Sequence, residues 1–142
     1  MRDPSFGGMT STQFLGAFND NFFKQIVLLL CVDAATDGSD LQPVALALFA
    51  LPFVLFSGFA GFLSDRISKR NIVVACKVWE VVVMALGVVA LAIGELGLLL
   101  AVLFFMGMQS AFFGPSKYGI MPEMLRSRDL PMANGTLQMT TF

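Results

Sequence analysis

LALFALPFVLFSGFAGFL, residues 46–63, is apolar on every face, and so is VVVMALGVVALAI, residues 81–93. A strand of an outer-membrane barrel instead alternates lipid-facing and lumen-facing side chains. In lipid, a helix satisfies its own backbone hydrogen bonds, which an isolated strand does not. We therefore predict an all-α protein whose long apolar segments cross a bilayer.

The composition agrees with a membrane environment. Of the 142 residues, 56% are hydrophobic and 13% are charged, whereas about a quarter of the residues in soluble domains are charged. A spanning helix needs about 20 residues. The predicted spans are residues 14–32, 44–63, 72–93 and 96–113.

The sequence after residue 113 is more polar and contains Pro115, Pro122 and Pro131. Because proline interrupts helices, we expect a loop with one short amphipathic turn there. A fifth span is expected to start near residue 133. The predicted fold class is a polytopic transmembrane helix bundle with four spans and the start of a fifth.

Several classes of function are disfavoured by the composition. The chain has no histidine, so the commonest general base and metal ligand is missing. The net charge of -1 makes nucleic acid a poor partner. Cys31 and Cys76 lie far apart in apolar runs, which favours neither a metal cluster nor a disulfide framework. We expect no enzyme activity, no metal and no cofactor.

Charged residues are distributed unevenly among the connections. Lysine and arginine are enriched on the cytoplasmic side of membrane proteins. Arg2 precedes the first span, and the second and fourth connections carry Arg66, Lys69, Arg70, Lys117, Arg126 and Arg128. The first and third connections carry only acids, which are Asp33, Asp37, Asp40 and Glu95. We therefore predict a cytoplasmic amino terminus and four crossings that return the chain to the cytoplasm.

The first span contains a polar cluster in FLGAFNDNFFKQIVLLLC, residues 14–31. Lys24 falls near the middle, where a cation costs about 2.5–3.5 kcal/mol, so it must face the bundle interior, water or a partner. Asp20 lies one turn earlier and can pair with it. Two interpretations stay open, a self-neutralising pair or a substrate or coupling-ion site. Asn19 and Asn21 favour the site, because added amides do nothing for a simple ion pair.

Lys77 and Glu80 lie three residues apart on one face of the third span. Lys77 can reach the headgroups with Glu80 following it, which is a structural role. The two residues can equally form a charged pair in a cavity. Both interpretations stay open.

The connection between the second and third spans reads GFLSDRISKR, residues 61–70. It resembles the loop signature of the major facilitator superfamily, G-x-L-x-D-R-x-G-[RK]-[RK], although Ser68 replaces the second glycine. The matching residues are Gly61, Leu63, Asp65, Arg66, Lys69 and Arg70. The resemblance implies that the acid and bases form a loop latch with neighbouring helix ends. The plain alternative is an ordinary basic cytoplasmic loop.

Three further motifs are similar to the bacterial lysophospholipid transporter branch of that superfamily. They are FLGAFNDN at residues 14–21, FFGPSKYGIMPEML at 112–125 and ANG at 133–135. The resemblance implies import of lysophospholipid across the inner membrane for reacylation. It also assigns Asp20 and Lys117 to a polar cavity that binds the headgroup or couples transport. The plain alternative for Lys117 is a headgroup anchor at a helix end.

The resemblance covers the amino-terminal part of a twelve-helix transporter, so we expect a missing carboxyl-terminal half and no activity from this chain alone. The expected partners are lysophospholipid, membrane lipids and that second half. One alternative is a proton-coupled exporter of amphipathic drugs that uses Asp20. Another is the membrane portion of a fusion with an acyltransferase and an acyl-acyl carrier protein synthetase, and a third is a membrane scaffold that transports nothing.

Overall fold

The computed structural model describes residues 4–35, 38 and 40–141, and every regular element in this part of the chain is an α-helix. Arg2 and Asp37 lie outside the described residues. The helices are α1 (Pro4–Asp33), α2 (Gln42–Arg66), α3 (Lys69–Ile93), α4 (Leu96–Met124) and α5 (Leu130–Met139). The first four are long and apolar enough to cross a membrane. The predicted all-α bundle is confirmed.

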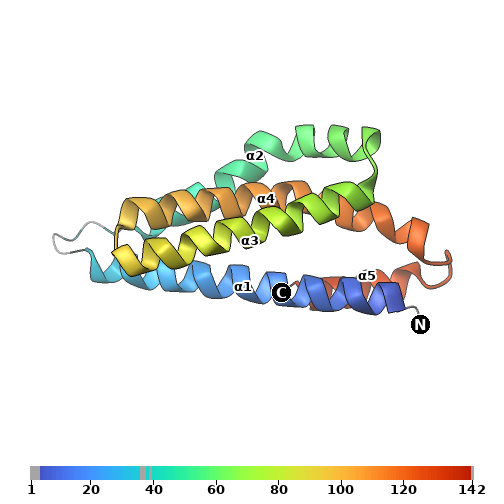
Figure 1. Ribbon diagram of the computed structural model, residues 1–142, viewed down its shortest axis with the longest axis horizontal. Helices are drawn as coiled ribbons and strands as arrows, with labels where there is room; N and C mark the ends of the chain where they lie inside the picture. The colour runs from blue at the N-terminus through green and yellow to red at the C-terminus, as the bar shows by residue number, and fades with distance from the viewer. Residues whose placement is uncertain (1–3, 36–37, 39, 142) are drawn as a thin grey trace.

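α4 is the central helix of the bundle. It packs along both α2 and α3, and it makes smaller contacts with α1 and α5 (Figure 1). The main core joins four helices through side chains such as Val27, Val83 and Leu103, which are almost completely buried. Because α4 contributes side chains to this core and contacts every other helix, it positions the helices around it.

α4 approaches the backbone of α2 closely at Gly107. A Cβ built on Gly107 would overlap the backbone oxygen of Phe49, and Pro52 is the next neighbour. Figure 1 shows α2 bending about half-way along its length, and Pro52 interrupts the backbone hydrogen bonds inside that helix. Gly58 and Gly61 of the same helix make no such contact, since a Cβ built on either would meet no atom of the described chain within 4 Å.

A second, smaller core forms at the other end of the bundle. Phe6 of α1, Met121 of α4 and Leu137 of α5 pack together there. This packing explains why α1 begins at Pro4, ahead of the predicted span, and why α4 continues to Met124. The loop predicted after residue 113 is therefore wrong up to Met124. Buried contacts outweigh the backbone hydrogen bonds that the two prolines remove.

The connections separate by charge at the two ends of the molecule. The α1–α2 and α3–α4 connections lie at one end, while the α2–α3 and α4–α5 connections lie at the other, beside the start of α1 (Figure 1). The first end carries Asp33, Asp40 and Glu95, and the second end carries Arg66, Lys69, Arg70, Arg126 and Arg128. Lys117, counted with the second end from the sequence, belongs instead to the interior of α4.

Candidate functional site

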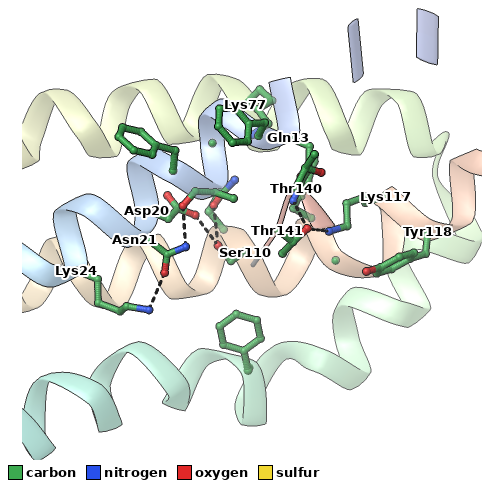
Figure 2. A pocket seen from close by; sticks show the side chains of 18 of the residues that line it. Gln13, Asp20, Asn21, Lys24, Lys77, Ser110, Lys117, Tyr118, Thr140 and Thr141 are labelled. Atoms are coloured by element: carbon green, nitrogen blue, oxygen red, sulfur yellow. Dashed lines mark hydrogen bonds between the residues drawn. The ribbon is translucent and has the colours of Figure 1, made fainter. Parts of the chain in front are cut away.

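A cavity of about 700 Å³ opens between α1, α2 and α4, and it is also lined by Lys77 of α3 and by residues 139–141 at the end of α5. We call it the polar cavity. Its charged lining residues are Asp20, Lys24, Lys77 and Lys117. Figure 2 shows Asp20 and Lys24 projecting from α1, with Lys117 further along the cavity. Charges predicted from separate spans are thus brought together at one site.

α1 contributes a polar stripe to this cavity. Gln13, Ala17, Asp20 and Lys24 follow one another at three- or four-residue spacing, so they share one face of the helix. A stripe of phenylalanines, Phe14, Phe18 and Phe22, runs beside it. Their rings stack with centroid separations of 6.4 and 6.1 Å. The first two of these phenylalanines also line the cavity.

Lys24 and Asp20 do not form the ion pair that their spacing predicted. Lys24 Nζ donates to Asn21 Oδ1 at 2.9 Å and lies 5.3 Å from the centre of the Phe49 ring. Among the described residues, no carboxylate lies within ion-pair distance of Lys24. Lys24 binds Asn21 because the amide is three residues away and offers an oxygen on the side that Lys24 faces.

Asp20 is bound to α4 instead. Ser110 Oγ donates to Asp20 Oδ2 at 3.2 Å (Figure 2). Asp20 Oδ1 is buried and accepts no hydrogen bond from the residues described. A buried oxygen without a donor is costly. Asp20 therefore has unused capacity to accept a proton, a cation or a donor from cargo.

Lys77 and Glu80 form the predicted pair, with 2.6 Å between Lys77 Nζ and Glu80 Oε2. The pair packs against α1 at Gly16, where a Cβ would meet both side chains. Gln109 Nε2 of α4 donates to the same Glu80 oxygen at 3.3 Å. Lys77 also lines the polar cavity, whereas Glu80 is not among its lining residues.

Lys117 is buried, with only 4% of its surface exposed. Its Nζ donates to Thr141 Oγ1 at 3.2 Å, and Gln13 Nε2 donates to the same hydroxyl at 3.0 Å. The described part of the chain places no carboxylate within ion-pair distance of Lys117. A buried ammonium with one hydrogen-bond acceptor has further N–H donors available for an anion.

Aromatic rings line the rest of the cavity and contact its lysines. Lys77 Nζ lies 4.7 Å from the centre of the Phe113 ring, and Lys117 Nζ lies 4.8 Å from that of Tyr118. Such contacts stabilise a cation only modestly. Three lysines face the cavity, whereas Asp20 is its one lining carboxylate among the described residues. The site therefore suits a molecule that has an anionic group and a large apolar part.

The loop signature lies outside this cavity, at the α2–α3 connection. Lys69 Nζ pairs with Glu123 Oε1 at 2.7 Å, which ties the start of α3 to the last turn of α4. The Arg66 guanidinium lies 4.6 Å from the centre of the Phe62 ring. Asp65 and Arg70 are exposed. Of the predicted latch residues, Lys69 is therefore the one that forms an ion pair in the described chain.

Not all predicted site residues reach the cavity, and some residues in it were missed. Asn19 is half-buried on α1 and does not line it. Gln109 and Ser110 do line it and were not predicted. The signal for them was available, because two adjacent polar residues interrupt an otherwise apolar run in the fourth span. Gln13 and Thr141 gave no comparable signal, since each lies in a mixed polar segment.

Comparisons with known proteins agree with this architecture. The family model for transmembrane secretion effectors of the major facilitator superfamily matches residues 32–139. The lysophospholipid transporter LplT of Enterobacter sp. (strain 638) is 30% identical over 138 residues, which cover 94% of this chain and 32% of that protein. The proteins of the same name from Photorhabdus laumondii and Salmonella heidelberg are 29% and 33% identical, each over 92% of this chain and 31% of the relative. The chain thus spans about a third of the length of the curated relatives it matches. No solved structure matches it.

Proposed function

The chain belongs to the transmembrane secretion effector family of the major facilitator superfamily, and on this premise we propose that it forms the amino-terminal helices of a lysophospholipid transporter. The transporter lies in the bacterial inner membrane and moves single-chain phospholipids inward for reacylation. The observation that carries the proposal is the polar cavity, which combines an excess of lysines over carboxylates with aromatic walls.

The chemistry of the cargo matches the two stripes of α1. A lysophospholipid has a phosphate-bearing headgroup and one acyl chain. The acyl chain fits along Phe14 and Phe18, where burying it removes apolar surface from water. The headgroup fits beside the polar stripe that contains Asp20 and Lys24. A lysophospholipid therefore fits along α1 with its acyl chain on the phenylalanine stripe and its headgroup on the neighbouring polar stripe.

We assign binding roles to the charged residues on the same grounds. Lys117 binds the phosphate, because it is buried, hydrogen-bonded once and free of carboxylate partners in the described chain. Asp20 accepts the cationic part of the headgroup or the coupling ion through its buried Oδ1. Asn21 and Lys24 complete the polar stripe. Asn19 has a supporting role outside the cavity wall.

The remaining part of the transporter supplies the second half of the bundle. This proposal is supported by the share of the relatives that the chain covers, 32% in the first case. Inverted or repeated halves that rock against each other are common in secondary transporters. We propose that the 142-residue chain alone does not transport, and that the Lys69–Glu123 pair is part of a latch between rocking states.

Uptake of labelled lysophosphatidylethanolamine tests the proposal. Cells without their own lysolipid uptake are given the intact transporter, and the label is followed into two-chain phospholipid. We expect uptake from the wild type and at least a tenfold loss in Asp20→Asn. If cells that carry the correctly inserted wild-type protein took up no label, the proposal would be wrong.

A drug exporter is the second candidate, because the family that matches the chain is one of secretion effectors. Such a protein would move amphipathic molecules outward and use Asp20 for proton coupling. Dye efflux measured on the same cells separates the two candidates. Efflux without lysolipid uptake selects the exporter. The reading frame beyond Phe142 decides whether an acyltransferase and a synthetase domain are fused to the transporter.

A further inference from the structure

A chain of polar contacts runs from α1 through α4 to α3. It starts at Asp20 Oδ2, which accepts from Ser110 Oγ at 3.2 Å. Ser110 Oγ also lies 3.2 Å from Gln109 Oε1, and Gln109 Nε2 donates to Glu80 Oε2 at 3.3 Å. The Lys77–Glu80 ion pair ends the chain at 2.6 Å. Two charged sites on different helices are thus connected by two uncharged side chains of α4.

The serine is the decisive member of this chain. A hydroxyl has one proton to donate, and Ser110 has two acceptors at the same distance of 3.2 Å. At any moment the Ser110 hydroxyl therefore donates its hydrogen bond to either Asp20 or Gln109, not to both. A carboxylate accepts a stronger hydrogen bond than an amide oxygen does. The Ser110 hydroxyl therefore donates to Asp20 as long as that carboxylate is ionised.

Neutralising Asp20 reverses this preference. Once a positive group or a proton occupies the carboxylate, Ser110 turns to Gln109 Oε1. The amide is then polarised and donates more strongly to Glu80, because hydrogen bonds in a chain reinforce one another. Gln109 is only 4% exposed, so water does not compete strongly for these contacts. The contact between Glu80 and Lys77 is altered as a consequence.

We infer that Ser110 and Gln109 are positioning residues that couple the occupancy of Asp20 on α1 to the Lys77–Glu80 pair on α3. The coupling passes through a single hydroxyl proton that has two alternative acceptors. The inference deepens the proposed function and rests on it for the role of Asp20 in transport. The contacts themselves do not depend on the identity of the cargo.

A mutant cycle on the intact transporter tests the coupling without any cargo. The apparent melting temperature in detergent is measured for Asp20→Asn, Glu80→Gln and the double variant. We expect the two shifts to be non-additive by about 2 °C or more. The non-additivity should disappear in the Ser110→Ala background and persist with Ser110→Thr, which keeps the hydroxyl.

Ser116→Ala is the matched control. Ser116 is a buried serine of the same helix that contacts Ser64 and lies outside the polar chain. In this background the non-additivity should remain. An equal non-additivity in Ser110→Ala would mean that Asp20 and Glu80 interact directly through space, and it would overturn the inference. Additive shifts in the otherwise wild-type protein would overturn it as well.

Transport kinetics give the second measurement. Ser110→Ala should lower the half-saturating lysolipid concentration about three- to tenfold, because the variant loses a stronger hydrogen bond in the empty state than in the occupied one. The maximal rate should change little, and Ser110→Thr should restore the wild-type affinity. A Ser110→Ala transporter with wild-type affinity contradicts a positioning role. If the wild type takes up no lysolipid, the proposed function fails, while the melting cycle still tests the coupling.

Discussion

Gly107 of α4 lies directly against the carbonyl oxygen of Phe49 on α2, and a Cβ at position 107 would overlap that oxygen. Gly107→Ala should therefore destabilise the bundle by about 1–3 kcal/mol, because a backbone oxygen cannot move aside as a flexible side chain can. Thermal unfolding of the purified transporter measures this loss. Gly97→Ala is the control, since Gly97 belongs to the same helix but faces open space. Equal stability of both variants contradicts the close contact.

Much of the fold could be predicted from the sequence, because uninterrupted apolar length is a local property. The length of α4 could not. Pro115 and Pro122 are helix breakers by local rules, yet Met121 is buried against Phe6 of the distant α1 and Leu137 of the following α5. Contacts with Phe6 and Leu137 keep this segment helical. No pattern within a short window contains that information.

The candidate site was likewise only partly predictable from the sequence. Asp20 and Lys24 could be singled out because charges in apolar segments are expensive, whereas Lys117 was assigned to the cavity through the resemblance of its motif to the transporter branch. Their partners could not be predicted, since spacing on a helix allows several. By its spacing, Lys24 could bind either Asp20 or Asn21. Only the fold shows that Lys24 binds Asn21 and that Ser110 of α4 donates to Asp20.

Lys117 offers the most direct test of headgroup binding. Lys117→Gln removes the charge while keeping a polar side chain near Thr141. Because a hydrogen bond to a charged group contributes about 1.5–3 kcal/mol, lysolipid uptake should fall at least tenfold at limiting concentration. Uptake at equal amounts of inserted protein measures the effect. Arg126→Gln, which neutralises an exposed cation in the α4–α5 connection, should leave uptake near wild type.

The Lys69–Glu123 pair should matter for transport more than for stability. The side chains are 28% and 60% exposed, and such surface pairs contribute about 1 kcal/mol or less. Lys69→Glu and Glu123→Lys should each slow uptake several-fold, whereas the charge-swapped double variant should recover most of the rate. A double variant as slow as the single ones would show that this pair is not part of the latch.

The orientation of the chain can be tested by cysteine labelling in intact cells. Glu95→Cys should react with a membrane-impermeant maleimide from outside, because the acidic end is expected in the periplasm. Ser127→Cys, between two exposed arginines, should react only after the membrane is permeabilised. The unmodified protein serves as the control, since Cys31 and Cys76 are both buried. The reverse pattern would invert the topology.

A substitution at Gly16 should affect transport without affecting the stability of the bundle. A Cβ at this position would come within 2.5 Å of Lys77 Nζ and 3.0 Å of Glu80 Oε1. These atoms are ends of flexible side chains, so Gly16→Ala displaces the ion pair rather than the helices. The gain in helix propensity, about 1 kcal/mol, should offset much of the cost, and the melting temperature should stay near wild type. Uptake should nevertheless fall several-fold. Gly8→Ala on the same helix, where a Cβ meets nothing, should change neither property, and a Gly16→Ala variant with normal uptake would show that the position of the pair is irrelevant to transport.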